Sequence, residues 1–260
     1  ICLVIFSCAP SVYKIHLTSL NFNVMSLTPE FEQWFSQQGW TFRSYQSEIF
    51  DKALLQQSVL LIAPTGAGKT LSGFLPVLHQ LRNVDSEYLH TLYISPLKAL
   101  TQDIHRNLLR PIEEMDLPIT VETRTGDTPS HKRQRQRKKP PHILLTTPES
   151  LMLMLSYADA PQIFGKLKTV IIDEVHSLTG NKRGDFTALA LARLETLAPG
   201  FLRIGLSATV AEPALIASWL GPTGDPVDIV KVEEQQRPDI QLLESDQRMP
   251  FGGFMAKYAV

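Results

Sequence analysis

The chain has 260 residues, of which 43% are hydrophobic and 20% are charged. These proportions supply a sizeable core and exclude a disordered, collagen-like or coiled-coil protein for the bulk of the chain. Basic and acidic residues number 25 and 26, so the formal net charge is −1. A generally basic nucleic-acid coat protein is therefore excluded, whereas a local basic groove is not.

Both cysteines, Cys2 and Cys8, lie near the N-terminus. No disulfide framework or cysteine-based zinc site can form further along the chain, which favours a reducing compartment. No apolar run reaches the ~18 residues that a membrane span needs. We therefore expect a cytoplasmic protein without membrane contacts.

Met25 is followed by Ser26-Leu-Thr-Pro-Glu30, a segment that suits the start of a helix. Thr28 suits the cap of a helix and Pro29 its first turn. We expect Met25 to be the biological start and residues 1–24 to be an unassigned stretch outside the native structure. A cleaved export signal is the alternative for this apolar stretch, although it lacks the positive flank of such signals.

From about residue 57, strand-like and helix-like segments alternate. Nearly continuous apolar runs, typical of strands buried on both faces of a parallel sheet, recur along the chain. They are 58–63, 91–94, 119–123, 142–147, 169–173 and 202–207. We predict an α/β fold, an open and mostly parallel sheet with helices on both faces, with ligands at the carboxyl ends of its strands.

A helix is predicted between Asp185 and Pro199, and its apolar residues are expected to share one buried face. They are Phe186, Leu189, Ala190, Leu194 and Leu197. The composition changes after Val232. We assign 25–232 to one domain and 233–260 to a linker, with one more strand at 240–243, leading into a truncated second domain.

A glycine-rich segment, Ala63-Pro-Thr-Gly-Ala-Gly-Lys-Thr70, follows the first strand and precedes a helix. This context is that of a P-loop, in which backbone N–H groups and a helix N-terminus surround a polyphosphate. Ala63 replaces the first glycine of the common signature. Lys69 would reach the β- and γ-phosphates, and the Thr70 hydroxyl would bind Mg²⁺. The expected ATP contacts in this loop are Thr65, Gly66, Ala67, Gly68, Lys69 and Thr70.

The strand that ends in Val170-Ile-Ile-Asp-Glu-Val-His176 carries two carboxylates. Asp173 would hold Mg²⁺, and Glu174 would polarise the attacking water. An acidic pair at a strand end is, taken alone, more often a helix cap or loop. Following a P-loop, it predicts nucleotide hydrolysis with Lys69, Asp173 and Glu174 as the catalytic residues.

The segments Asp173-Glu-Val-His176 and Ser207-Ala-Thr209 together resemble the DExH branch of superfamily 2 helicases. Other segments follow in the family's order. Those that look like strand-tracking motifs are 95–103, 124–128 and 146–151, and 43–46 is similar to the adenine-reading segment. A closer likeness, to Lhr-type (large helicase-related) proteins and the shorter ligase-associated DEXH-box helicases, is carried by 39–46, 176–184 and 204–210. The resemblance covers roughly 28–260.

The resemblance implies a RecA-like P-loop NTPase domain, the first motor domain of an ATP-dependent DNA helicase. Such a motor translocates on single-stranded or forked DNA and unwinds duplexes in bacterial DNA repair, with ligase or nuclease partners. Gln46 would hydrogen-bond adenine and Arg43 would stack on it. Ser207 and Thr209 would couple hydrolysis to movement, and His176 would contact the second motor domain.

The implied nucleic-acid contacts follow predicted strands or the acidic pair. They are Pro96, Lys98, Arg124, Thr125, Gly126, Thr147, Pro148, Glu149, Lys182 and Arg183. Solvent exposure is the alternative for Lys98, and pairing with a nearby carboxylate is the alternative for the last two. The basic run 132–139 is either a DNA clamp or a solvated helix face.

The sequence departs from the family in one respect: nothing after residue 210 resembles the second domain's arginine motifs. An arginine finger contributes about 10³–10⁵ in rate to related phosphoryl transfers. We therefore expect this chain alone to bind ATP–Mg²⁺ but to hydrolyse it poorly and not to unwind DNA. An RNA-dependent ATPase and a nucleotide-gated nucleic-acid-binding module without turnover remain alternatives.

Overall fold

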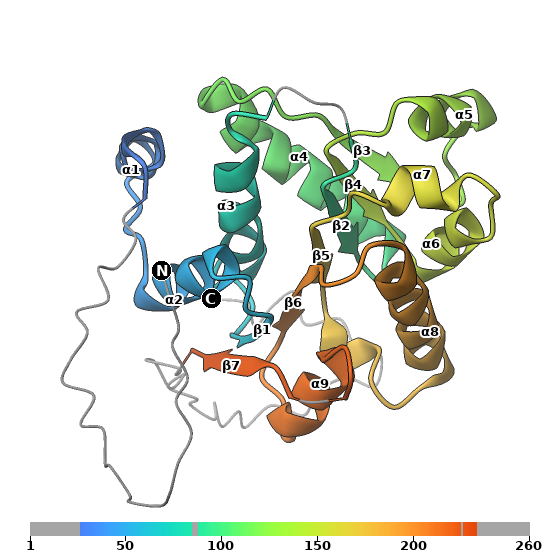
Figure 1. Ribbon diagram of the computed structural model, residues 1–260. Coiled ribbons are helices and arrows are strands. Elements are labelled where there is room, and N and C mark those ends of the chain that lie inside the picture. The colour runs from blue at the N-terminus through green and yellow to red at the C-terminus, as the bar shows by residue number, and fades with distance from the viewer. Residues whose placement is uncertain (1–26, 85–87, 225, 233–260) are drawn as a thin grey trace, which may run out of the picture.

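The computed structural model describes residues 27–84, 88–224 and 226–232 (Figure 1). Within them, seven strands form one all-parallel sheet in the order β3-β4-β2-β5-β6-β1-β7. The strands are Val59–Ile62 (β1), Thr91–Ile94 (β2), Val121–Arg124 (β3), Ile143–Thr146 (β4), Thr169–Ile172 (β5), Leu202–Ser207 (β6) and Asp228–Lys231 (β7). The predicted open α/β sheet is confirmed.

The described part of the chain also contains nine α-helices and one 3₁₀ helix, of which the first two α-helices precede β1. The first five α-helices are Pro29–Gln37 (α1), Ser44–Leu54 (α2), Lys69–Leu81 (α3), Lys98–Glu114 (α4) and Ser130–Lys138 (α5). The others are Pro148–Leu155 (α6), Ala160–Phe164 (α7), Lys182–Leu197 (α8) and Pro213–Leu220 (α9), with the 3₁₀ helix Val175–Ser177 (η1) before α8. Every strand-to-strand connection from β1 to β6 contains a helix, as parallel pairing requires.

The sheet is buried on both faces because each strand is apolar at successive positions. Val59 and Leu61 lie in one hydrophobic cluster with α1 to α4, whereas Leu60 and Ile62 lie in a second cluster with α6 to α9. All four side chains are at most 1% exposed. Alternation of side chains across the pleat therefore gives the sheet helices on both faces, as predicted.

The strand β7, which pairs with β1 at one edge of the sheet, was not predicted from the sequence. Of its four residues only Val230 is buried. A short strand with Asp228 and Lys231 at its ends shows no apolar run because its side chains face solvent.

The predicted buried face of the helix after residue 185 was wrong at two positions. Phe186 is 38% exposed and Leu189 is 62% exposed. The helix α8 turns Thr187 and Leu191 inward instead, and it approaches the preceding chain so closely that a Cβ on Gly184 would lie 1.7 Å from the Leu178 carbonyl oxygen. This close approach, which only glycine permits, places the Gly184 side of α8 against the preceding chain.

Some sequence predictions lie outside the described residues. They concern 1–24 with Cys2 and Cys8, the start at Met25, the linker 233–238 and the strand 240–243. Thr28 and Pro29 are the cap and the first residue of α1, as predicted. Among the described residues no helix is long and apolar enough to cross a membrane.

Candidate active site and nucleic-acid interface

The glycine-rich loop joins β1 to α3 and has the backbone shape of a phosphate cradle. Gly66 and Gly68 have φ angles of +79° and +84°, a left-handed conformation that favours glycine. Gly68 is the residue that precedes α3, so the free N–H groups of that helix open onto the loop. The Lys69 ammonium is nearly buried and donates to the carbonyls of Ala63 (2.9 Å) and Pro64 (3.1 Å).

The predicted Mg²⁺ ligand Asp173 follows β5 and is 5% exposed. Burial raises the pKa of its carboxyl group, and the neighbouring Glu174 raises it further, while a hydrogen bond from Tyr93 and the charge of Lys69 lower it. The Tyr93 hydroxyl, fully buried on β2, donates to the Asp173 carboxylate. No sequence pattern indicates this contact, because Tyr93 lies within an apolar strand 80 residues away.

Glu174 has a left-handed backbone, with φ at +47°. This conformation costs about 1–2 kcal/mol for a residue with a Cβ, and such outliers cluster at functional sites. It turns the chain sharply from β5 into η1. The Glu174 carboxylate then lies 3.3 Å from Nδ1 of His176.

The three residues expected to couple hydrolysis to movement lie near this turn. His176 Nδ1 is 3.2 Å from the Ser207 hydroxyl and accepts from the Ala208 N–H at 3.4 Å. Ser207 is fully buried at the end of β6, and Thr209 is exposed two residues later. The structure thus connects His176 to Ser207 within this domain.

The segment expected to read adenine, 43–46, lies beside the loop. Gln46 is buried, and its side-chain oxygen accepts from the Arg43 N–H at 3.0 Å. The exposed Arg43 guanidinium donates to the carbonyl of Ala67 at 3.2 Å. These residues line a pocket of about 450 Å³ together with Trp40, which is 49% exposed. Trp40 therefore lines the pocket, although the sequence did not identify it as a site residue.

The donor set fits Mg²⁺. The Thr70 hydroxyl and the Asp173 carboxylate are the oxygen ligands that this ion prefers, and Mg²⁺ is commonly bound through one or two protein groups plus substrate phosphates. In the described ranges no three His, Cys, Asp or Glu side chains gather into a metal cluster.

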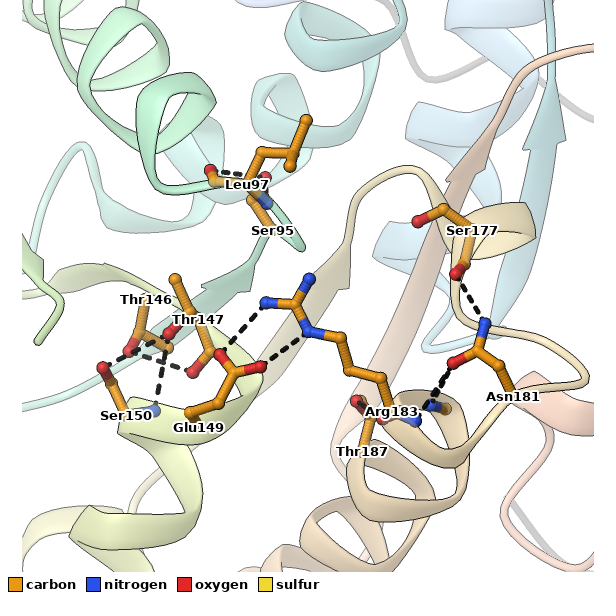
Figure 2. Close-up of polar contacts among 11 residues, drawn as sticks. Ser95, Leu97, Thr146, Thr147, Glu149, Ser150, Ser177, Asn181, Arg183 and Thr187 are labelled. Carbon is orange, nitrogen blue, oxygen red and sulfur yellow. Dashed lines mark hydrogen bonds and ion pairs between the residues drawn. The ribbon is translucent and has the colours of Figure 1, made fainter.

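Two cations of the predicted nucleic-acid set, Lys98 and Arg183, pair with carboxylates. Lys98, at the start of α4, lies 3.1 Å from Asp127. Figure 2 shows Arg183 at the start of α8 reaching Glu149 at the start of α6, with nitrogen–oxygen distances of 2.6 and 3.0 Å. Arg183 and Glu149, both predicted contacts, are thus brought together, and Lys182 beside them is exposed.

Five other predicted contacts are buried: Pro96, Arg124, Thr125, Thr147 and Pro148. Thr147 caps α6, because its hydroxyl accepts from the Ser150 N–H at 3.4 Å. Arg124 is 3% exposed and donates to the Arg133 carbonyl in α5 at 3.2 Å. Burial lowers the pKa of its guanidinium. Gly126, in contrast, is exposed.

Residues 43–216, which span the loop and the acidic pair, match a family model described as DEAD/DEAH box helicase. The chain belongs to this family. The "ATP-dependent helicase Lhr-Core" of Methanocaldococcus jannaschii is 40% identical over 227 residues, which are 82% of this chain and 27% of that protein. The "Lhr helicase/uracil glycosylase" of Escherichia coli is 39% identical over 83% of this chain and 15% of that protein.

A solved structure gives the same result. The Mycobacterium smegmatis helicase Lhr, bound to ssDNA and AMP-PNP, matches with a TM-score of 0.73 and 39% identity, over 79% of this chain and 28% of that one. The resemblance to Lhr-type helicases and the RecA-like fold are confirmed. The chain spans about a quarter of the length of the archaeal relative and of this structure.

Proposed function

We propose that this chain is the ATP-binding motor domain of an Lhr-type DNA helicase. The observation that carries the proposal is that Lys69, Asp173 and Ser207 follow or end three neighbouring strands, β1, β5 and β6. Their carboxyl ends meet at one edge of the sheet, where open α/β folds bind ligands. The names of the relatives support ATP-dependent helicase activity.

In this proposal the loop N–H groups and Lys69 bind the β- and γ-phosphates, while Thr70 and Asp173 hold Mg²⁺. The bound ion neutralises charge that develops on the phosphates. Glu174, which follows Asp173, orients the attacking water and accepts its proton. Gln46 hydrogen-bonds adenine, Arg43 stacks on it, and His176, Ser207 and Thr209 transmit the change towards a second motor domain.

The substrate in this proposal is single-stranded or forked DNA. Support comes from the M. smegmatis relative, which was solved with ssDNA, and from the cluster of predicted contacts after β2, β3 and β4. Hydroxyls, backbone N–H groups and a few cations suit binding that is indifferent to sequence. A DNA-repair role with ligase or nuclease partners is a finer part of the proposal and rests on the resemblance. The cytoplasmic location and the domain bounds of 25–232 are further parts and rest on the sequence pattern.

Phosphate release from ATP–Mg²⁺, with and without single-stranded DNA, tests the proposal on the 260-residue chain. We expect retained ATP binding with slow turnover at most, and loss of binding in Lys69→Ala. Glu174→Gln should bind ATP but lose the residual turnover, because general base catalysis contributes about 10²–10⁴-fold. Equal phosphate release from Glu174→Gln and wild type would overturn the catalytic assignment. Competition between DNA and RNA strands of the same sequence tests the choice of substrate, because only RNA presents a 2′-hydroxyl.

A further inference from the structure

The helix α5 lies at the outer end of the proposed DNA path. From the strands of the nucleotide site, the sheet continues through β2 and β4 to its edge strand β3. The predicted contacts follow these three strands, and α5 comes directly after the β3 contacts. Figure 1 shows α5 at the side of the molecule opposite α2 and β7. A strand that leaves the contacts at β3 would therefore meet α5 next.

Six cations and no acidic residue occupy 132–139. The cations are Lys132, Arg133, Arg135, Arg137, Lys138 and Lys139. Glu122 pairs with Arg135 at 2.7 Å and with Lys132 at 3.9 Å, and Asp159 pairs with Arg137 at 2.8 Å. These pairs use two negative charges for three cations, so α5 retains an excess of positive charge.

The helix is held in place by polar contacts. Its one buried residue is Gln136, which donates to the Thr123 carbonyl at 3.1 Å. Arg133 donates to the Thr128 carbonyl at 2.6 Å, and the Arg137 guanidinium lies 4.6 Å from the centre of the Tyr157 ring. A helix without an apolar face contributes little to the core. The polar contacts nevertheless hold α5 in a fixed position, so its cations lie at a defined place on the surface. This fixed position favours a DNA clamp over a solvated helix face.

A pocket of about 470 Å³ joins α5 to the predicted contacts. It is lined by Lys98 and Thr125 from that set, by Thr128 at the turn before α5, and by Lys132 from α5 itself. Asp127 also lines the pocket and pairs with Lys98. Two ammonium groups and two hydroxyls around one hollow are donors that suit a phosphate group.

We propose that this pocket and α5 bind the phosphodiester backbone of single-stranded DNA as the strand leaves the β3 edge of the sheet. Lys132 is the contact inside the pocket, and the exposed Lys138 continues the path along the helix. The inference rests on the proposed function, since it extends the DNA path of the same motor. It predicts that strands long enough to reach α5 bind more tightly than strands that end at β3.

The test measures binding of labelled oligodeoxythymidines of increasing length to the 260-residue chain at several salt concentrations. We expect Lys132→Gln to bind long strands several-fold more weakly than wild type and short strands equally well. Removal of one lysine–phosphate interaction should lower the slope of log affinity against log salt by about 0.7. Lys168→Gln is the matched control. It removes the same charge from an exposed residue just before β5, at the amino ends of the strands and away from the predicted contacts, and should bind like wild type.

Lys138→Gln is a second variant, for the case that Lys132→Gln lowers the melting temperature. It leaves the ion pair between Lys132 and Glu122 intact and also removes a proposed DNA contact on α5. Equal affinity and equal salt slope for wild type, Lys132→Gln and Lys138→Gln at every length would overturn the inference and leave the proposed function standing. Failure of wild type to bind any strand would overturn the proposed function itself, and the inference with it. An equal loss of affinity in Lys168→Gln would show only an effect of net charge and would also overturn the inference.

Discussion

Two groups of predicted site residues differ in the hydrogen bonds and ion pairs that they make. We call the predicted ATP contacts with Asp173 and Glu174 the nucleotide half, and the predicted nucleic-acid contacts the nucleic-acid half. In the nucleotide half, Lys69 and Gln46 make their contacts with backbone groups of their own or neighbouring loops. In the nucleic-acid half, cations pair with carboxylates from distant segments, as Arg183 does with Glu149. A site built within one loop is encoded locally, whereas a site built between loops depends on the tertiary fold.

The difference has a functional consequence. The glycine-rich loop already holds the left-handed backbone at Gly66 and Gly68, so a bound nucleotide needs to order little of it. Lys69 would only exchange the Ala63 and Pro64 carbonyls for phosphate oxygens. On the proposed function, the cations of the other half exchange a carboxylate for a phosphate when DNA binds. We therefore expect substitutions in the first half to act on nucleotide affinity, and those in the second half to act on salt-dependent DNA affinity.

The largest expected effect concerns the position of Arg183. Gly184→Ala should lower the free energy of unfolding by about 3 kcal/mol or more, because its Cβ would overlap the Leu178 carbonyl and force α8 to move. Urea denaturation measures this loss. Gly126→Ala is the control, since the nearest atoms to its Cβ belong to the end of the Lys98 side chain at 3.5 Å. Its stability should change by less than about 0.5 kcal/mol. Equal stability of the two variants would contradict the packing described for α8.

A second prediction concerns the hydrogen bond that links the two halves. Tyr93 lies on β2, whose end leads to the DNA contacts, yet it binds Asp173 of the nucleotide site. Tyr93→Phe should cost about 1–3 kcal/mol of stability, because the buried carboxylate loses its donor. Nucleotide affinity should fall more with Mg²⁺ present than without it, since the Asp173 carboxylate loses its orientation.

Isothermal titration with and without Mg²⁺ checks the prediction for Tyr93→Phe. Tyr88→Phe, which removes a hydroxyl from a half-buried ring outside the site, serves as the control. The same Mg²⁺ dependence in Tyr93→Phe and wild type would show that the hydroxyl does not position Asp173.

The smallest effect is expected for the exposed pair of the nucleic-acid half. A double-mutant cycle of Arg183→Gln and Glu149→Gln should give a coupling energy of about 0.2–1 kcal/mol. Partial burial raises the pKa of Glu149, but hydrogen bonds from Arg183, a backbone N–H and Thr147 bring it below the ordinary value of 4.5.

The sign of the pH dependence follows from this depressed pKa. The stabilisation by the pair is present above pH 4.5 and is lost as the pH falls through the lower pKa of the folded state. Melting temperatures of wild type and Arg183→Gln should therefore differ near pH 7 and converge in acid. A difference that persists at low pH would exclude the ion pair as its source.

Much of the fold could be predicted from the sequence because each buried strand is a short apolar run between turn residues. Six strands were found in this way, whereas β7 was missed because its outward side chains show no such run. The buried side of α8 was also missed. The helix packs with Gly184 close to Leu178, and periodicity cannot show such an approach.

The candidate site, too, could be predicted only in part. The sequence identified the P-loop and the acidic pair because adjacent residues supply their shape. Tyr93 and Glu122 were missed, because each matters through a partner on another element. Tyr93 binds Asp173, and Glu122 pairs with Arg135 of α5. The roles of the individual residues stay predictions until the variants are measured.

On the proposed function, Lys69, Asp173 and Glu174 form one site for ATP–Mg²⁺. The most direct test of this assignment is a titration of wild type, Lys69→Ala and Lys168→Ala with a fluorescent, non-hydrolysable ATP analogue, with and without Mg²⁺. We predict Mg²⁺-dependent binding to wild type and Lys168→Ala, and at least tenfold weaker binding to Lys69→Ala, a difference of about 1.4 kcal/mol. Equal binding to Lys69→Ala and wild type, or binding indifferent to Mg²⁺, would contradict the account.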